Sequence, residues 1–153
     1  MNRVLTIALA VIFLTAAGCL KQDQIDYAKQ DMELIEQYIA DNNLTATRHD
    51  SGIYYIIDEP GNSQHPVSSS KVTVRYKGYF INGTVFDQTQ GTTTTTFTLS
   101  GLIPGWQIAI PLLGKGGKGT FLIPSALAYG SYGSGPIPPN TPLIFDIELV
   151  TFE

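Results

Sequence analysis

The stretch "KVTVRYKGYFINGTVFDQ" at residues 71–88 predicts two paired strands joined by a tight turn. Apolar and polar side chains alternate through residues 71–81, with Val72 and Val74 on one face, which is the pattern of a half-buried strand. The dipeptide Asn82–Gly83 follows, and it is the strongest short-range signal for a β-hairpin. The hairpin therefore predicts an antiparallel sheet, and the rest of the chain supplies its other strands.

Further β-rich segments flank this hairpin. They are "GIYYII" at 52–57, "TTTTTFTLS" at 92–100, "KGTFLIPS" at 118–125 and "PLIFDIELVTF" at 142–152. A single helix is expected to begin at Pro104, because proline suits the first helical turn, and Pro111 and Gly114 limit it to about two turns. The pattern predicts an α+β domain, in which an antiparallel sheet of five or six strands curls around one short helix.

Composition excludes several classes of function. The chain has 153 residues, of which 43% are hydrophobic and 14% charged, as expected of a globular domain. The net charge is −4 and no cluster of Lys and Arg is present, so we expect no nucleic-acid partner. With one Cys and two His, the chain is too poor in ligands for a Cys/His metal site, and we expect no metal and no cofactor. His49 and His65 lie outside the motifs and are expected at the surface.

Residues 1–18 have the pattern of a secretory signal peptide. Arg3 is followed by an apolar run and by small residues that end at Cys19, the only cysteine of the chain. The apolar run is too short to span a membrane readily. The sequence "TAAGC" resembles a bacterial lipobox, although Ala16 stands where leucine is usual. This resemblance implies cleavage before Cys19, lipidation of Cys19, and a membrane-anchored lipoprotein that faces the periplasm or the cell exterior; the alternative is a plain signal peptide.

An acidic helix is expected between the anchor and the domain. Residues 22–43 carry six acidic residues and one Lys, and apolar residues recur along one helical face at positions 25, 28, 32, 35 and 39. Asn42 and Asn43 tolerate the left-handed conformation that ends helices. We interpret residues 19–44 as an acidic helical linker and 45–153 as the domain. Two readings of the helix stay open: it packs on its own domain or acts as a spacer, or it dimerises.

Four motifs occur in an order that resembles the FKBP family of peptidyl-prolyl isomerases. They are "VTVRYKGYFINGTVFDQT", "LIPGWQIAI", "LAYG" and "IPPNTPLIFDIELV", and the resemblance covers about residues 51–153. The family's fold is a five- or six-stranded antiparallel sheet curled around a short helix, with an aromatic pocket between them. That fold agrees with the pattern read independently from the strands.

The resemblance implies a set of pocket residues. Those implied in catalysis are Tyr76, Phe86, Asp87, Ile103, Trp106, Tyr129 and Phe145, and those implied in substrate binding are Leu102 and Ile137.

The implied roles differ from residue to residue. Trp106 forms the floor, the backbone N–H of Ile103 holds a ligand carbonyl, and Tyr129 supplies a hydroxyl. Asp87 positions Tyr76 rather than transferring a proton. The loop "SALAYGSYGSGPIPP" at 125–139 becomes a flap over the pocket, because it is rich in turn-forming Gly and Pro. All of the implied pocket residues lie beyond residue 75, so the acidic helix is expected to be dispensable for catalysis.

Three departures from the family pattern are visible. Thr95 stands where an aromatic residue is usual, which opens one wall and weakens the expected binding of bulky macrolide inhibitors. Pro111 shortens the helix that follows Trp106. The flap is one residue short.

A pocket without an acid or base still suits prolyl isomerisation. Rotation about the bond before proline has a barrier of about 18–20 kcal/mol, which arises from lost amide resonance. A dry aromatic pocket disfavours the polar planar amide relative to the less polar twisted amide. The expected substrates are proline-containing unfolded or partly folded polypeptides, exported proteins among them. The alternative is a non-catalytic chaperone or binding module that uses the same pocket.

Overall fold

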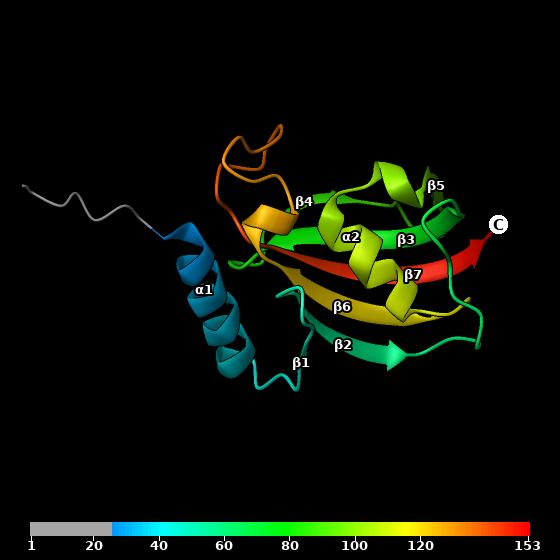
Figure 1. Ribbon diagram of the computed structural model, residues 1–153, viewed down its shortest axis with the longest axis horizontal. Helices are drawn as coiled ribbons and strands as arrows, with labels where there is room; N and C mark the ends of the chain where they lie inside the picture. The colour runs from blue at the N-terminus through cyan, green and yellow to red at the C-terminus, as the bar shows by residue number, and fades with distance from the viewer. Residues whose placement is uncertain (1–25) are drawn as a thin grey trace, which may run out of the picture.

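The computed structural model describes residues 26–153, and it shows one antiparallel sheet with a helix on each face (Figure 1). Cys19 and the signal segment lie outside the described residues. The helices are α1 (Tyr27–Asp41) and α2 (Pro104–Ala109), and the strands are β1 (Thr47–Arg48), β2 (Tyr54–Glu59), β3 (Lys71–Phe80), β4 (Val85–Gln88), β5 (Thr95–Thr98), β6 (Lys118–Ile123) and β7 (Leu143–Phe152).

The sheet is built around its two longest strands, β3 and β7. The strand order is β1-β2-β6-β7-β3-β4, and β5 pairs with the first half of β3 while β4 pairs with the second half. The α+β fold is confirmed, but the count is seven strands rather than five or six. The additional strand β1 has two residues and no alternation of its own, and it exists because it pairs with Tyr54 and Tyr55.

The predicted hairpin is confirmed, with a loop of three residues. Gly83 N–H donates to the carbonyl of Phe80, and Phe80 N–H donates to the carbonyl of Thr84. Gly83 has a φ of 85°, whereas Asn82 is not left-handed, so this is a type I turn followed by a left-handed glycine rather than a two-residue turn.

The segment at 92–100 is a strand only over Thr95–Thr98. Those four residues pair with the first four of β3, from Lys71 to Val74. Leu99–Gly101 then forms a 3₁₀ turn, because Leu99 is buried in the core and its N–H donates to the carbonyl of Ser70.

The core lies between the sheet and α2, and the alternating strand pattern determines which side chains enter it. Every second residue of β7 from Leu143 onward faces this core and is buried: Leu143, Phe145, Ile147 and Leu149. They are joined by Val72 and Val74 of β3 and by Trp106 of α2. As Pro111 and Gly114 predicted, α2 is short; a 3₁₀ turn at Ile110–Leu112 follows it directly.

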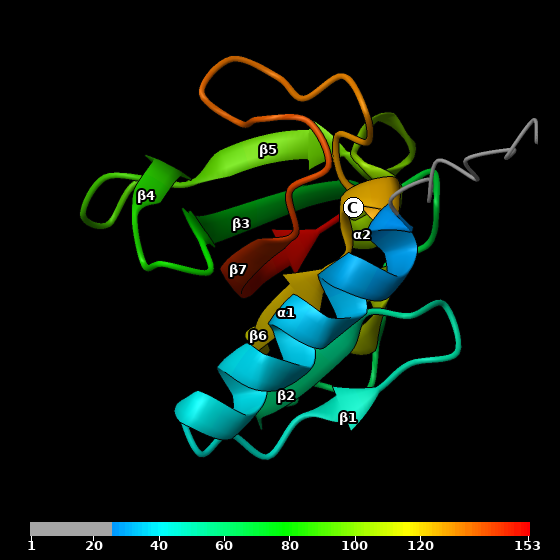
Figure 2. The ribbon, with the colours of Figure 1, turned by 90° about the vertical axis from the view of Figure 1, so that its left-hand side faces the viewer.

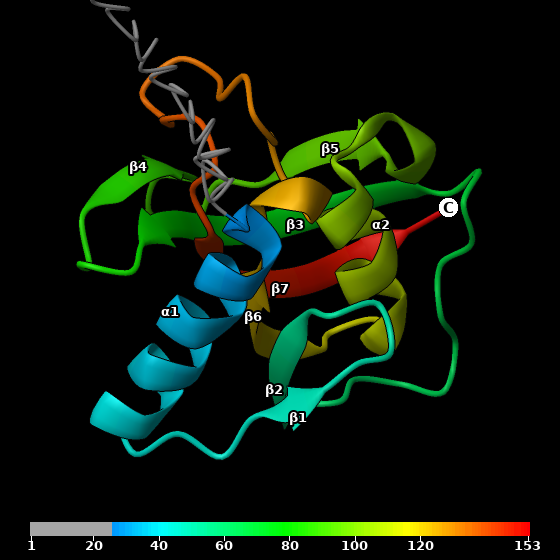
Figure 3. The same ribbon diagram turned by 60° about the vertical axis from the view of Figure 1, so that its left-hand side comes forward.

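The opposite face of the sheet is covered by α1 (Figures 2 and 3). Ile35 is fully buried against Tyr54, Leu122 and Ile144, which project from β2, β6 and β7 away from the main core. The helix therefore packs on its own domain, which was the first of the two readings. It ends as predicted, with Asn43 in the left-handed region at a φ of 52°. No helix in the described part of the chain is both long and apolar enough to cross a membrane.

Candidate functional site

A pocket of about 190 Å³ lies between the sheet and α2. It is lined by eight of the nine residues implied by the sequence, together with Phe97: the lining residues are Tyr76, Phe86, Asp87, Phe97, Leu102, Ile103, Trp106, Tyr129 and Phe145. These come from β3, β4, β5, the N-terminus of α2, the flap and β7. Segments far apart in the sequence thus converge on one cavity, which we call the aromatic pocket.

Trp106 lies at the centre of the aromatic pocket. It is 4% exposed, and three rings pack edge-to-face against its indole: Tyr76 at 5.1 Å, Phe145 at 5.2 Å and Phe97 at 6.0 Å between centroids. Edge-to-face contacts of this kind fix the relative orientation of aromatic rings. The floor of the pocket is therefore rigid as well as apolar.

The one carboxylate of the aromatic pocket is already engaged. The Tyr76 hydroxyl donates to Asp87 Oδ2 at 2.5 Å. Burial, followed by this hydrogen bond and the charge of Asp87, raises the pKa of Tyr76 well above its usual range. Tyr76 therefore stays protonated at neutral pH, and its hydroxyl is held by Asp87.

Because Gly78 has no side chain, the rings of Phe86 and Phe145 can come into contact. It pairs with Asp87 on β4 and with Phe145 on β7, in the middle of the sheet. A Cβ atom at this position would lie 2.7 Å from the ring of Phe86 and 2.8 Å from that of Phe145. These rings pack edge-to-face at 5.7 Å, so the glycine leaves the space in which they touch.

Replacing Gly78 with alanine should displace the Phe86 ring and disorder this wall. We expect a destabilisation of about 1–3 kcal/mol, typical of overpacking, together with weaker binding of prolyl peptides. Denaturant unfolding and peptide titration measure the two effects. The matched control is Gly101→Ala, where an added Cβ meets nothing within 4 Å. Equal losses in both variants would contradict this account.

Two hydrogen-bond donors remain for a ligand. Within the described part of the chain, neither the N–H of Ile103 nor the hydroxyl of Tyr129 makes a hydrogen bond. Burial and, to a lesser degree, the charge of Asp87 raise the pKa of Tyr129, so its hydroxyl is protonated at neutral pH. The aromatic pocket thus offers donors to a carbonyl and has no free base.

The backbone around Tyr129 is held by a contact that the sequence did not predict. The carbonyl of Ser125 accepts from Ala128 N–H and Gly130 N–H, at 2.9 and 2.8 Å. The N–H of Ser125 in turn donates to Asp31 Oδ2 of α1 at 2.7 Å, and Asp31 is 1% exposed. Helix α1 is therefore tied to the loop that carries Tyr129 (Figure 3).

The observed site differs in three respects from the site that the sequence predicted. Ile137 is not among the residues that line the aromatic pocket; it is buried, and its backbone closes a turn with Ser134. Phe97, two residues after Thr95, does line the pocket and packs edge-to-face against Trp106. Phe97 was detectable as the only aromatic residue of a Thr-rich strand. No signal in the sequence distinguished Asp31 from the other acidic residues of its helix.

No group of three or more His, Cys, Asp or Glu side chains within residues 26–153 is arranged to hold a metal ion. His49 is partly exposed and His65 is exposed, and both lie outside the aromatic pocket.

The curled sheet, the short helix and the pocket between them define an FKBP-like domain. Residues 62–150 match the family of FKBP-type peptidyl-prolyl cis-trans isomerases. A probable FKBP-type isomerase, FkpA, of Neisseria meningitidis is 46% identical over 102 residues, which cover 65% of this chain and 38% of that protein. The outer membrane protein MIP of Legionella longbeachae is 43% identical over 103 residues, or 66% of this chain and 44% of that protein.

The crystal structure of FkpA from Escherichia coli superposes with a TM-score of 0.74 at 35% identity, over 84% of this chain and 61% of that one. This chain belongs to the FKBP-type peptidyl-prolyl cis-trans isomerase family. It spans about half or less of the length of the two curated relatives described above.

Proposed function

We propose that this protein is a peptidyl-prolyl cis-trans isomerase that assists the folding of exported proteins. Family membership supports the reaction class. The observation that carries the proposal is the convergence of eight sequence-implied residues on one aromatic pocket. Its volume of about 190 Å³ suits a single ring-sized group rather than a large cofactor.

The mechanism needs no nucleophile. The prolyl ring sits against the indole of Trp106, and the surrounding rings exclude water from the amide. Loss of hydration raises the energy of the polar planar amide more than that of the twisted amide, which lowers the barrier. The Ile103 N–H and the Tyr129 hydroxyl donate hydrogen bonds on the carbonyl side of the rotating bond and hold the peptide in place. A barrier lower by about 4–5 kcal/mol accelerates rotation roughly a thousandfold or more.

The test is an isomerisation assay on the full chain with a short prolyl peptide. Magnetisation exchange between cis and trans resonances measures the rate without a coupling protease. We expect exchange to accelerate in proportion to protein concentration. Uncatalysed rotation takes about 10–100 s at 25 °C, so even modest catalysis is readily seen. Unchanged exchange, combined with suppressed aggregation of an unfolded client, would replace this proposal with the non-catalytic chaperone.

We also propose that the protein is a lipoprotein of the bacterial cell envelope. The support is the lipobox-like "TAAGC" around Cys19 and the resemblance to a relative described as an outer membrane protein. The lipoprotein's several acyl chains anchor it stably, whereas a single chain binds only marginally.

Replacing Cys19 with serine should therefore move the protein from the membrane fraction to the soluble fraction. The physical reason is that the acyl chains attach through the cysteine. Fractionation and immunoblotting of cells that express either form measure the distribution. Membrane association that persists in the serine variant would contradict the lipobox interpretation.

A further inference from the structure

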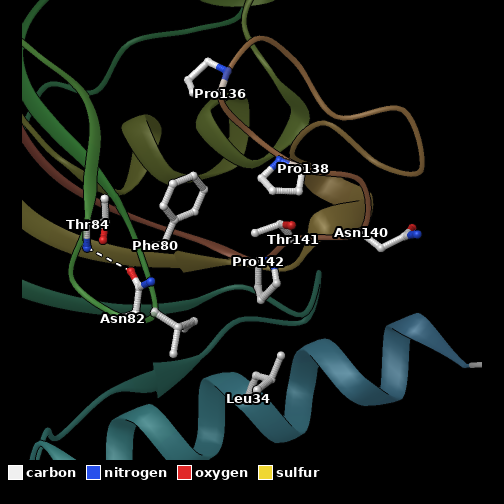
Figure 4. A pocket seen from close by; sticks show the side chains of 10 residues that line it. Leu34, Phe80, Asn82, Thr84, Pro136, Pro138, Asn140, Thr141 and Pro142 are labelled. Atoms are coloured by element: carbon white, nitrogen blue, oxygen red, sulfur yellow. Dashed lines mark hydrogen bonds between the residues drawn. The ribbon is translucent and has the colours of Figure 1, made fainter.

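We propose that a second apolar cavity, next to the aromatic pocket, binds the apolar side chains that flank proline in a client polypeptide. This inference rests on the proposed isomerase function and names the kind of client segment that the site prefers. The cavity has a volume of about 560 Å³. We call it the outer groove, and its apolar lining residues are Leu34, Phe80, Ile81, Pro136, Pro138 and Pro142 (Figure 4).

Three parts of the fold form the outer groove. Figure 4 shows Leu34 rising from α1 on one side and Pro136 and Pro138 of the flap on the other, with the ring of Phe80 between the flap and the β3–β4 hairpin. Leu34 is 40% exposed, so its side chain is accessible to a ligand in the groove. Helix α1 contributes one side of the groove through Leu34.

The outer groove adjoins the aromatic pocket through one pair of rings. Phe80 lines the groove and Phe86 lines the aromatic pocket, and their centroids are 5.1 Å apart. A chain that leaves the aromatic pocket on the side of Phe80 and Phe86 passes next to the groove. An extended chain advances about 3.3–3.6 Å per residue, so residues a few positions from the proline reach it.

The chemistry of the groove selects for apolar, uncharged segments. Its polar lining consists only of Asn and Thr side chains. Three of its walls are prolines, which have no backbone N–H, so the groove contacts a ligand through apolar surface more than through hydrogen bonds. Such a surface tolerates many sequences provided that they are apolar. Apolar stretches next to proline are buried in folded proteins and accessible in unfolded chains, so the occupant is an unfolded client.

The test compares prolyl peptides that differ only near the proline. Peptides of about ten residues carry either Leu or Ser two to four positions from the proline, on one side or the other, and a four-residue peptide reports on the aromatic pocket alone. For the full-length protein we expect kcat/KM to be about tenfold higher for the better Leu peptide than for its Ser counterpart, the lower end of what apolar contacts contribute to specificity.

Leu34→Gln should remove most of this preference and leave the rate on the four-residue peptide unchanged. Glutamine has nearly the helix propensity of leucine, and position 34 is exposed, so the variant should stay folded. The matched control is Val67→Gln, which replaces an apolar side chain that is 63% exposed and lines neither cavity. It should keep the full preference.

Several results would overturn the proposal. One is an equal kcat/KM of the wild-type protein for the Leu and Ser peptides. Another is a preference for the Leu peptide that persists in the Leu34→Gln variant. A concentration-dependent dimer that Leu34→Gln disrupts would assign the groove to a second copy instead. If the four-residue peptide is not isomerised at all, the proposed function fails. The groove proposal is then tested by whether the groove binds the Leu peptide. In that case, NMR resonances of Leu34 and Thr141, which both line the groove, would support the groove proposal if they shift with the Leu peptide only. Unshifted resonances would overturn the proposal.

Discussion

Replacing Phe86 with alanine should lower kcat/KM for prolyl isomerisation at least about tenfold, a loss of about 1.4 kcal/mol of transition-state stabilisation. Phe86 lines the aromatic pocket and packs between Phe80 and Phe145, at 5.1 and 5.7 Å between ring centroids. Without the ring, water reaches the amide, and the environment that favours the twisted state is lost. Cis–trans exchange of the four-residue peptide measures the effect.

The domain should remain folded in this variant. Truncation of a fully buried Phe costs about 3–5 kcal/mol, and Phe86 is only partly buried, so the cost should be smaller. The matched control is Val85→Ala on the same strand, where the side chain is exposed and does not line the aromatic pocket. A folded Phe86→Ala protein with undiminished activity would refute the role that we assign to the pocket.

Replacing Asp31 with alanine should impair both stability and catalysis, although Asp31 lies outside the aromatic pocket. The change leaves the N–H of Ser125 buried without an acceptor, which costs about 1–3 kcal/mol. It also loosens the turn in which Ser125 holds the residues on either side of Tyr129. Displacement of a positioning group by about 1 Å can cost up to about 100-fold, so we expect roughly a tenfold loss in kcat/KM. Urea unfolding and peptide exchange measure the two effects.

Two further variants separate positioning from stability. Asp31→Asn keeps an acceptor for Ser125 and should retain near wild-type activity. Ile35→Ala removes a fully buried side chain one turn further along α1 and should cost about 2–5 kcal/mol, yet leave activity intact under conditions where the protein is folded. If Asp31→Ala behaves like Ile35→Ala, the contact is structural only, and the helix is dispensable for catalysis as the sequence suggested.

The sheet and the short helix could be predicted from the amino-acid sequence alone. These depend on local signals: alternation in β3 and β7, proline at the start of α2, and a glycine that ends the hairpin turn. Each signal acts over a few residues, so it can be read without the fold. The resemblance to the FKBP family then implied a set of pocket residues, eight of which line the aromatic pocket.

The packing partner of α1 could not be predicted from the sequence. Its apolar stripe predicted a buried face but not a partner, since the apolar side chains that receive it, Tyr54, Leu122 and Ile144, lie on three different strands. Asp31 looked like one more solvated acid until the fold placed Ser125 beside it, 94 residues away in the chain. Phe97 belongs to the aromatic pocket because its ring packs against Trp106, which lies on a different element. Contacts between distant segments depend on how whole elements pack, and no local pattern encodes them.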